Sequence, residues 1–421
     1  MSSTRLETVA KPTDFDDLRA KMTALAPEVS EWRRDLHQHP EIGYELPRTS
    51  KFVAEKLESF GVEVVETAMG GAGVVGRLQG KQEGQNTGDA IMIRADMDAL
   101  PMDEETGLPY ASTIPGHFHG CGHDGHTACL LGAAKHLAET RNFSGTVYFC
   151  FQPAEEGGAG AKAMIDDDLF VRYPVKAIYG AHNWPTMPVG WMGCSSGRML
   201  AASQEFYIRI YGKGGHAARP HEARDPIVAG ADLVTTLQGI VSRTCDPVET
   251  AVVSITSFVS RSNETGEPAT NVLPERARLS GTLRALSNTT MAQMKRDLRA
   301  RARAVAQAHR VRIEVEMDDK PYPALINSRR EANFAARVMK GLLGPQHCVI
   351  DPPPAMGSED FAYYLLRDKR TGIRVPGCFV TFGNGLRGPM LHNPKYDFND
   401  EAIPYVVAFW TKIAEGSLKP A

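Results

Sequence analysis

A run of six residues, Cys121-Gly-His-Asp-Gly-His126, contains a thiol, two imidazoles and a carboxylate. Such groups are the usual ligands of zinc and of neighbouring divalent metals. The two glycines leave the backbone free to direct these side chains to one point. Cys121 and His123 are the candidate ligands, and His126 is expected to begin the next helix and to lie behind them. A lone histidine is more often packed or exposed than metal-bound, but the whole cluster favours metal-assisted chemistry.

Two adjacent carboxylates, Glu155 and Glu156, follow a short apolar segment that reads as a strand. Because adjacent side chains diverge on an extended chain, one of them can bind a metal while its neighbour faces the substrate. The second carboxylate would then act as a general base toward a water molecule. A solvated acidic turn is the alternative for this dipeptide taken alone.

Four further donors stand at the ends of apolar segments or in loops: Asp96, Asp98, His182 and His392. One of the two aspartates can ligate a metal or orient a ligand histidine, and a turn stabilised by Asx hydrogen bonds is the alternative. For either histidine, taken alone, a core residue is the alternative.

Gly357 and Ser358 precede a helix expected over residues 360–366. Free backbone N–H groups at a helix start form a natural carboxylate site. A simple capping box explains the same residues equally well.

The segment Gly212-Lys-Gly-Gly-His216 is a glycine-rich loop with a histidine. It lacks the Gly-Lys-Ser/Thr ending of a phosphate loop, so that interpretation is rejected. His216 on such a loop can stabilise an oxyanion, and the polar residues Asn271 and Arg284 can bind a substrate carboxylate. Structural roles are the alternative for both of these residues.

Strand-like and helix-like segments alternate before residue 200 and again after residue 319. This order predicts an α/β domain with a mixed, largely parallel sheet and helices on both faces. Ligand groups gather beyond the carboxyl ends of such strands. The intervening residues read β-α-β-β-α-β, a ferredoxin-like α+β arrangement. We therefore expect a first domain of residues 1–200 and 319–421, with a second domain of residues 201–318 inserted into it.

The expected helices cover residues 15–39, 49–60, 126–139, 225–242, 290–309, 328–343 and 404–415. The expected strands cover residues 62–66, 73–78, 90–94, 145–151, 177–182, 204–211, 251–259, 276–286, 311–317 and 378–382.

Composition excludes several classes of protein. The chain has 421 residues, more than one typical core, and its net charge of −3 disfavours nucleic acid as a partner. It contains no apolar run long enough to cross a bilayer and no apolar signal core at its start. Its seven cysteines are odd in number and widely spaced, which is typical of a reduced cytoplasmic protein.

Taken together, these motifs resemble the metallopeptidase family of aminoacylases, succinyl-diaminopimelate desuccinylases and glutamate carboxypeptidases. The nearest likeness is to hippurate hydrolases and plant auxin-conjugate (IAA-amino acid) amidohydrolases. The resemblance follows family order along nearly the whole chain, through the segments 34–41, 94–101, 121–126, 152–156, 212–216, 271–274 and 357–360.

The resemblance implies a role for each matching residue. It implies two divalent metals per subunit, of zinc, manganese, cobalt or nickel, and Glu155 as the general base. Asp98 takes the place of an aspartate that orients a metal-binding histidine, and Asp96 takes the place of that histidine in the wider family. The implied metal ligands are Cys121, His123, Glu156, His182 and His392.

The same resemblance implies that residues 1–200 and 319–421 form the catalytic domain and that the inserted residues 201–318 form a lid and dimerisation domain. His216 would reach the active site of the partner subunit in a homodimer, or in a tetramer built from dimers. Asn271 and Arg284 would bind the substrate carboxylate, with Gly357 and Ser358 beside it.

The resemblance implies an amidohydrolase that cleaves N-acyl amino acids, either hippurate-like or N-acetyl conjugates, into a carboxylic acid and an amino acid. Glu155 would deprotonate a water that bridges the metals, and this water would attack the amide carbonyl. A dipeptidase or carboxypeptidase on the same site is one alternative. A non-catalytic metal- or ligand-binding protein and a structural zinc protein are the others. We expect no nucleic-acid or membrane partner.

Overall fold

The computed structural model describes residues 12–81, 88–261 and 269–419. The chain divides into two compact units. The first unit comprises Met1–Gly197, Ile326–Pro353 and Tyr363–Ala421, and the second comprises Arg198–Leu325 and Pro354–Ala362. Each unit is described by itself.

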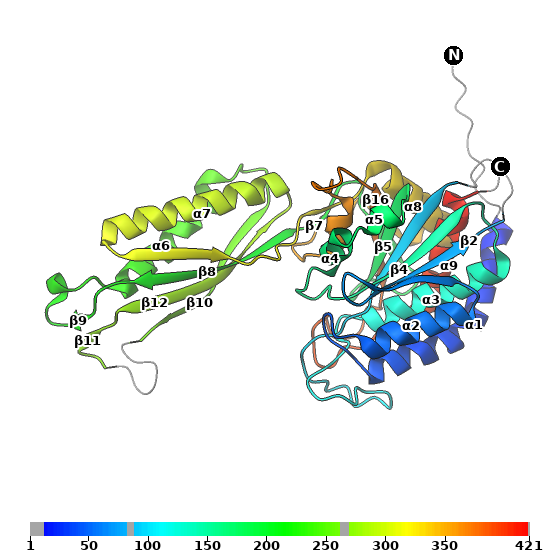
Figure 1. Cartoon of the computed structure of the whole chain (residues 1–421), viewed down its shortest axis with the longest axis horizontal. Coiled ribbons are helices and arrows are strands. Elements are labelled where there is room, and N and C mark those ends of the chain that lie inside the picture. The colour runs from blue at the N-terminus through cyan, green and yellow to red at the C-terminus, as the bar shows by residue number, and fades with distance from the viewer. Residues whose placement is uncertain (1–11, 82–87, 262–268, 420–421) are drawn as a thin grey trace, which may run out of the picture. The chain divides into compact units, whose positions relative to one another are not determined.

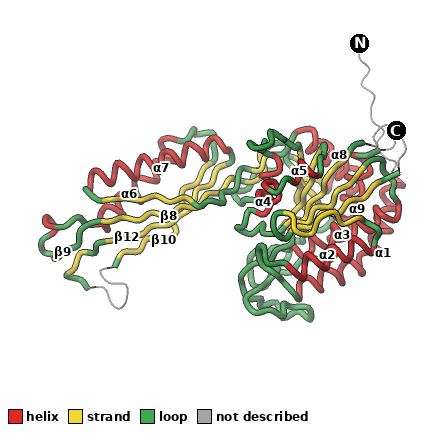
Figure 2. Tube along the Cα trace, in the orientation of Figure 1, coloured by secondary structure: helices red, strands yellow, loops and turns green. Residues whose placement is uncertain are grey.

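The first unit is built on an eight-stranded sheet with the order β1-β2-β4-β3-β5-β16-β6-β15. Figures 1 and 2 show strands of this sheet together with the helices that pack on it. Its centre is parallel, because β3 runs parallel to β4 and β5, and β5 runs parallel to β16. The sheet is therefore mixed and largely parallel, as predicted. The strands are β1 Glu63–Met69, β2 Gly73–Gln79, β3 Ala90–Asp96, β4 Thr146–Gln152, β5 Ala177–Trp184, β6 Met192–Cys194, β15 Cys348–Ile350 and β16 Gly377–Gly383.

Helices cover both faces of this sheet, since its central strands are apolar on both sides. On one face, Val147 and Phe149 of β4 share a core with the larger helices. On the other face, Cys150 lies 4.0 Å from Met164 of α4. The helices on the first face are α1 Pro12–Gln38, α2 Pro47–Ser59, α3 His123–Thr140, α8 Arg329–Leu343 and α9 Ile403–Ser417. Those on the other face are α4 Gly160–Asp166 and α5 Leu169–Arg172.

The second unit contains a four-stranded antiparallel sheet with the order β10-β12-β8-β13. Two helices pack on it through a core that joins Leu233 and Leu298 to Phe206 and Ile208. The chain order is β-α-β-β-α-β, as the sequence predicts. The elements are β8 Ala202–Tyr211, α6 Pro226–Gly239, β10 Ala251–Ser260, β12 Arg276–Ala285, α7 Asn288–His309 and β13 Arg312–Met317. A short ribbon of β9 Gly215–His216 and β11 Val272–Leu273 extends from this sheet.

The second unit differs from the expected range of 201–318, because it runs from Arg198 to Leu325 and also includes the segment Pro354–Ala362. Ala201 donates its backbone N–H to the carbonyl of Gly357 (2.8 Å), and Ala355 donates to that of Met199 (3.0 Å). Such contacts between segments far apart in the sequence leave no local signal. Two short strands, β7 Arg198–Leu200 and β14 Leu325–Ile326, lie where the chain passes between the units.

The helix expected over residues 360–366 is instead a six-residue 3₁₀ helix, Asp360–Leu365. The helix expected over 225–242 ends at Gly239 and continues as a π turn, Ile240–Thr244. Within the described ranges, no helix is both long enough and apolar enough to cross a bilayer.

Candidate metal centre

The candidate site lies at one edge of the parallel sheet of the first unit. Asp96 ends β3 opposite Gln152, which ends β4, and His182 lies near the end of β5. Glu155 follows β4 by three residues. Because the carboxyl ends of parallel strands meet at one edge, residues distant in the sequence come together there.

The loop from Cys121 to His123 is shaped by Gly122, whose φ of 90° is left-handed and favours glycine. Helix α3 begins directly after it, so His123 lies in the first helical turn rather than in an irregular loop. The expectation that the helix starts at His126 was wrong by three residues. Both His123 and His126 are buried.

The five predicted ligands converge in two overlapping groups within the described chain. The ligand atoms of Cys121, His123 and His182 lie within 4.8 Å of one another, and so do those of Cys121, Glu156 and His392. Cys121 Sγ lies 3.4 Å from His182 Nε2. Glu156 Oε1 lies 3.2 Å from His392 Nε2. The shared thiol places the two groups side by side, an arrangement suited to two cations.

Two of the imidazoles are oriented so that a lone pair faces the centre. His123 Nδ1 lies 2.8 Å from the carbonyl of Asp98, and His182 Nδ1 lies 2.7 Å from that of Asn183. Since a carbonyl only accepts, each Nδ1 carries the proton and each Nε2 is left as a donor to metal. His123 Nε2 is buried and has no hydrogen-bond partner. A buried nitrogen without a partner is costly unless something coordinates it.

The electrostatics of the centre favour a cation. Burial lowers the pKa of His123, but the carboxylates of Asp96, Asp98 and Glu156 outweigh it and raise this pKa to about 10. Burial, with the positive potential of neighbouring histidines, lowers the pKa of His182 to about 3. Burial and the nearby glutamates raise the pKa of the Cys121 thiol well above its usual range. This negative field around imidazole and thiol donors fits a divalent metal, which would displace the second proton of His123 and the proton of the thiol on binding.

Glu155 and Glu156 occupy a turn that is fixed by Asp98. The two carboxylate oxygens of Asp98 accept the backbone N–H groups of Glu155 (2.9 Å) and Glu156 (3.0 Å). Ala154 has a φ of 53°, a strained left-handed conformation for alanine. The turn brings an oxygen of each glutamate within 4.8 Å of a ring nitrogen of His123.

His392 also has a left-handed backbone, with a φ of 63°. Its N–H donates to the carbonyl of Gly120 (2.8 Å), which ties its loop to the loop that carries Cys121. Residue 392 thus adopts a strained conformation at the point where it meets Glu156.

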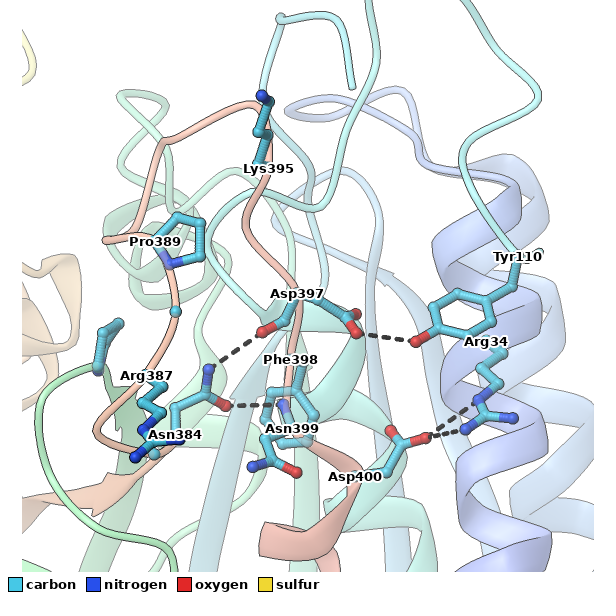
Figure 3. A pocket seen from close by; sticks show the side chains of 13 residues that line it. Arg34, Tyr110, Asn384, Arg387, Pro389, Lys395, Asp397, Phe398, Asn399 and Asp400 are labelled. Carbon is cyan, nitrogen blue, oxygen red and sulfur yellow. Dashed lines mark hydrogen bonds and ion pairs between the residues drawn. The ribbon is translucent and has the colours of Figure 1, made fainter. Parts of the chain in front are cut away.

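The segment 384–400, which carries His392, is closed by one asparagine (Figure 3). Asn384 Nδ2 donates to the carbonyl of Asp397 (3.1 Å), and Asn384 Oδ1 accepts the N–H of Asn399 (2.8 Å). A pocket of about 350 Å³ lies against this segment, and none of the five predicted ligands lines it. Its walls include Arg34, Tyr110, Pro185, Asn384, Arg387, Lys395 and Asp400.

Helix α1 holds the same segment through two arginines. Arg33, fully buried, donates to Asp397 (3.0 Å) and Asp400 (2.9 Å), while Arg34 donates to Asp400 (2.8 Å). Tyr110 donates to the other oxygen of Asp397 (2.8 Å). The bonds of Tyr110 and Arg34 are drawn in Figure 3.

Arg33 also lies 3.6 Å from Asp124, the residue after His123, and Asp124 in turn contacts His37 Nδ1 at 2.8 Å. Burial lowers the pKa of His37, but Asp124 and Glu104 outweigh it and raise this pKa from 6.5 to about 9. His37 is therefore charged at neutral pH and stabilises the fold in that form.

We expect His37→Gln to destabilise the protein most below pH 6.5, because the contribution of a histidine with a raised pKa is fully present there. The difference from wild type should shrink as the pH rises through about 9. The raised pKa corresponds to roughly 3 kcal/mol. Urea unfolding between pH 6 and 10 measures the difference in unfolding free energy between the variant and wild type. A substitution of the exposed His221, His221→Gln, is the control. A difference independent of pH would refute the charged pair.

The predicted lid residues all lie in the second unit, in two separate places. His216 of β9 pairs with Val272 of β11, and Ala217 donates to the carbonyl of Asn271 (3.0 Å). At the other place, Arg284 donates to Ser358 Oγ (2.8 Å).

A strand separates these two places. Arg284 lies eight residues along β12 from Arg276, whose partner Tyr211 begins the turn toward His216. At about 3.3 Å per residue, that distance is roughly 26 Å. The structure therefore brings His216 together with Asn271, and Arg284 together with Ser358, but keeps the pairs apart within one chain. The carbonyl of Gly357 accepts the N–H of Ala201 (2.8 Å), and Glu359 Oε1 accepts the N–H of Phe361 (2.9 Å).

Comparison with known proteins identifies the family. The model of Peptidase family M20/M25/M40 matches residues 92–416. The chain belongs to this peptidase family. The mixed, largely parallel sheet with its helices, predicted from the sequence, is the fold of this family. Membership of the family makes the protein a hydrolase.

Curated relatives and solved M20 structures match nearly the whole chain. The hippurate hydrolase of Campylobacter jejuni is 38% identical over 93% of this chain and 97% of that protein. The IAA-amino acid hydrolase ILR1-like 4 of Arabidopsis thaliana is 36% identical over 97% of this chain and 87% of its own. The YXEP protein of Bacillus subtilis, a dinuclear metal binding peptidase of the M20 family, is 30% identical with a TM-score of 0.78, over 95% of this chain and 100% of that one.

Sequence reasoning missed several buried residues around the centre, among them Arg94, Asn183 and Tyr396. Arg94 had a signal, because a charged residue inside an apolar strand needs a buried partner. Asn183 and Tyr396 had only their positions close to His182 and His392.

Proposed function

We propose that this M20 hydrolase is a metal-dependent amidohydrolase that cleaves N-acyl amino acids into a carboxylic acid and an amino acid. The observation that carries the proposal is the convergence of Cys121, His123, Glu156, His182 and His392 in two overlapping groups beside Glu155. Two divalent cations, of zinc, manganese, cobalt or nickel, would be held there and would supply Lewis-acid activation of a carbonyl and of water.

Glu155 is proposed as the general base. Its carboxylate takes a proton from the attacking water, whose oxygen bonds to the amide carbonyl carbon. The carbon–nitrogen bond then breaks, and Glu155 returns the proton to the leaving amine nitrogen. Asp98 accepts the two backbone N–H groups of this turn, so the backbone that carries the Glu155 side chain has a fixed position.

The substrate class rests on the relatives and on the second unit. Hippurate hydrolase and IAA-amino acid hydrolase are both named for amides that join an acid to an amino acid. Arg284, half-buried beside Ser358, is suited to a substrate carboxylate. We also propose that Asn271 and Gly357 contribute to that binding and that His216 stabilises the oxyanion.

A homodimer through the lid domain is proposed because one chain keeps His216 away from Arg284. If both act on one substrate, His216 must come from the partner subunit. Residues 201–318 are the proposed lid. We infer a reduced, cytoplasmic setting, which is supported by all seven cysteines being free.

A hydrolysis screen after metal removal tests the function. Chelated protein should stay folded and lose activity, and Zn²⁺, Mn²⁺, Co²⁺ or Ni²⁺ should restore it. The panel contains N-benzoyl and N-acetyl amino acids, with the amino acid and acyl group varied independently, and dipeptides. Cleavage of an N-acyl amino acid is the expected result.

Other outcomes contradict the proposal. Cleavage of dipeptides alone would make the protein a peptidase. Tight ligand binding with full metal occupancy and no turnover would make it a binding protein. Unfolding on chelation would assign a structural zinc site.

A further inference from the structure

A chain of buried polar side chains lies behind the proposed ligands and contains none of them. Its five members are Arg94, Asp96, His126, Asn183 and Tyr396, which we call the buried polar chain. None of them is more than 3% exposed. Polar groups so deeply buried must be fully paired, or they destabilise the fold.

The carboxylate of Asp96 contacts two other members of the buried polar chain. Its Oδ1 lies 2.6 Å from His126 Nδ1, and its Oδ2 accepts from Arg94 NH1 at 2.7 Å. Arg94 Nε donates to Gln152 at the end of β4 (2.8 Å). By contrast, Asp96 Oδ2 lies 3.8 Å from His123 Nε2, the nitrogen that faces the metal centre. Both oxygens of Asp96 thus serve the buried polar chain.

The buried polar chain continues from His126 to the loop that carries His392. His126 Nε2 lies 2.7 Å from Asn183 Oδ1, and Asn183 Nδ2 donates to the hydroxyl of Tyr396 at 2.5 Å. Tyr396 N donates to the carbonyl of Asn393, the residue after His392 (2.9 Å). The ring of His126 also packs edge-on against that of His182, with centroids 4.6 Å apart.

The members of the buried polar chain sit on the same segments as the ligands. His126 is one helical turn after His123 on α3, Asn183 directly follows His182 on β5, and Tyr396 is four residues after His392. The buried polar chain therefore connects three segments through side-chain hydrogen bonds. These segments must keep their relative positions for their ligands to meet. Backbone hydrogen bonds of the sheet do not by themselves fix α3 or the loop that carries His392.

We propose that the buried polar chain positions the metal ligands, and that Asp96 acts in it as a positioning residue and not as a ligand. The inference rests on the proposed ligand set. It differs from a direct role of Asp96 with His123 and His126, three residues whose ligand atoms also lie within 4.8 Å of one another. Partners that orient ligands typically contribute about 10- to 100-fold in metal affinity.

Mn²⁺ titration calorimetry of the full-length, metal-stripped protein tests the proposal without any substrate. Asp96→Asn and Asn183→Ala should each bind two Mn²⁺ ions with about 10- to 100-fold lower affinity than wild type. Tyr396→Phe removes only one hydroxyl and should lower the affinity about three- to tenfold. This variant is expected to fold even if Asp96→Asn does not.

Asn327→Ala is the matched control. Asn327 is also a buried asparagine of the first unit, and its side chain bonds to the carbonyls of Ser195 and Phe379 and to the N–H of Phe379. Asn327→Ala and Asn183→Ala should both lower the thermal stability of the metal-free protein, but only Asn183→Ala should lower Mn²⁺ affinity.

Three results would overturn the proposal. A loss of one Mn²⁺ equivalent in Asp96→Asn, with Asn183→Ala and Tyr396→Phe unchanged, would make Asp96 a ligand. Unchanged affinity in all three variants would remove any positioning role. An equal loss in Asn327→Ala would reduce the effect to general stability. A wild-type protein that binds two Mn²⁺ ions but hydrolyses no N-acyl amino acid would refute the proposed function and leave this binding comparison valid.

Discussion

Glu155→Gln is expected to yield a folded protein that binds metal like wild type and hydrolyses N-acyl amino acids about 10³- to 10⁴-fold more slowly. Glutamine has the shape of glutamate but cannot accept the proton of the attacking water. General acid–base catalysis typically contributes 10²- to 10⁴-fold, and Glu155 is proposed to act in both proton transfers. The loss corresponds to roughly 4 to 5.5 kcal/mol of transition-state stabilisation. Steady-state kcat, with metal content measured on the same samples, is the readout.

The position of Glu155 explains why folding should survive the change. Asp98 binds the backbone N–H of Glu155, so the turn is held through the main chain, which the substitution leaves intact. Glu139→Gln, on the exposed end of α3, is the control for removing a carboxylate and should keep wild-type kcat. Wild-type turnover in Glu155→Gln would show that another group is the base.

Local patterns were sufficient to predict part of the site at the edge of the sheet. Asp98, Glu155 and His182 each follow or end an apolar strand, and parallel strands bring such positions together whatever their distance in the sequence. The prediction of the order β-α-β-β-α-β in the second unit also depended only on local periodicity.

What could not be predicted from the sequence depends on contacts between distant segments. Arg33 meets Asp397 and Asp400 across more than 360 residues, and no periodic pattern marks that pairing. The contact between Asp96 and His126 is likewise visible only once α3 lies against β3. The position of Asp96 at the end of β3 is compatible both with metal binding and with contacts to Arg94 and His126. The orientation of its carboxylate, which the sequence does not reveal, decides between these roles.

Gly122→Ala is expected to disrupt the metal centre. A Cβ at this position would lie 2.6 Å from both Asn183 Oδ1 and the hydroxyl of Tyr396. Gly122 separates Cys121 from His123, so the clash would displace two proposed ligands and part of the buried polar chain at once. With a φ of 90°, alanine would also be strained. We expect a loss of roughly 2 to 5 kcal/mol in stability and Mn²⁺ affinity at least about 100-fold weaker.

Gly107→Ala separates the clash from the backbone strain. Gly107 has a φ of 68°, and a Cβ there would meet no atom within 4 Å. This control should therefore show only the conformational cost of about 1 to 2 kcal/mol and bind Mn²⁺ like wild type. Urea unfolding and Mn²⁺ titration of both variants isolate the contribution of close packing at Gly122. If the two alanine variants bound Mn²⁺ equally well, the contact between Gly122 and the Asn183–Tyr396 pair would have no part in holding the ligands. A selective loss in Gly122→Ala would show that the ligand loop is seated on that pair, since strain alone is common to both.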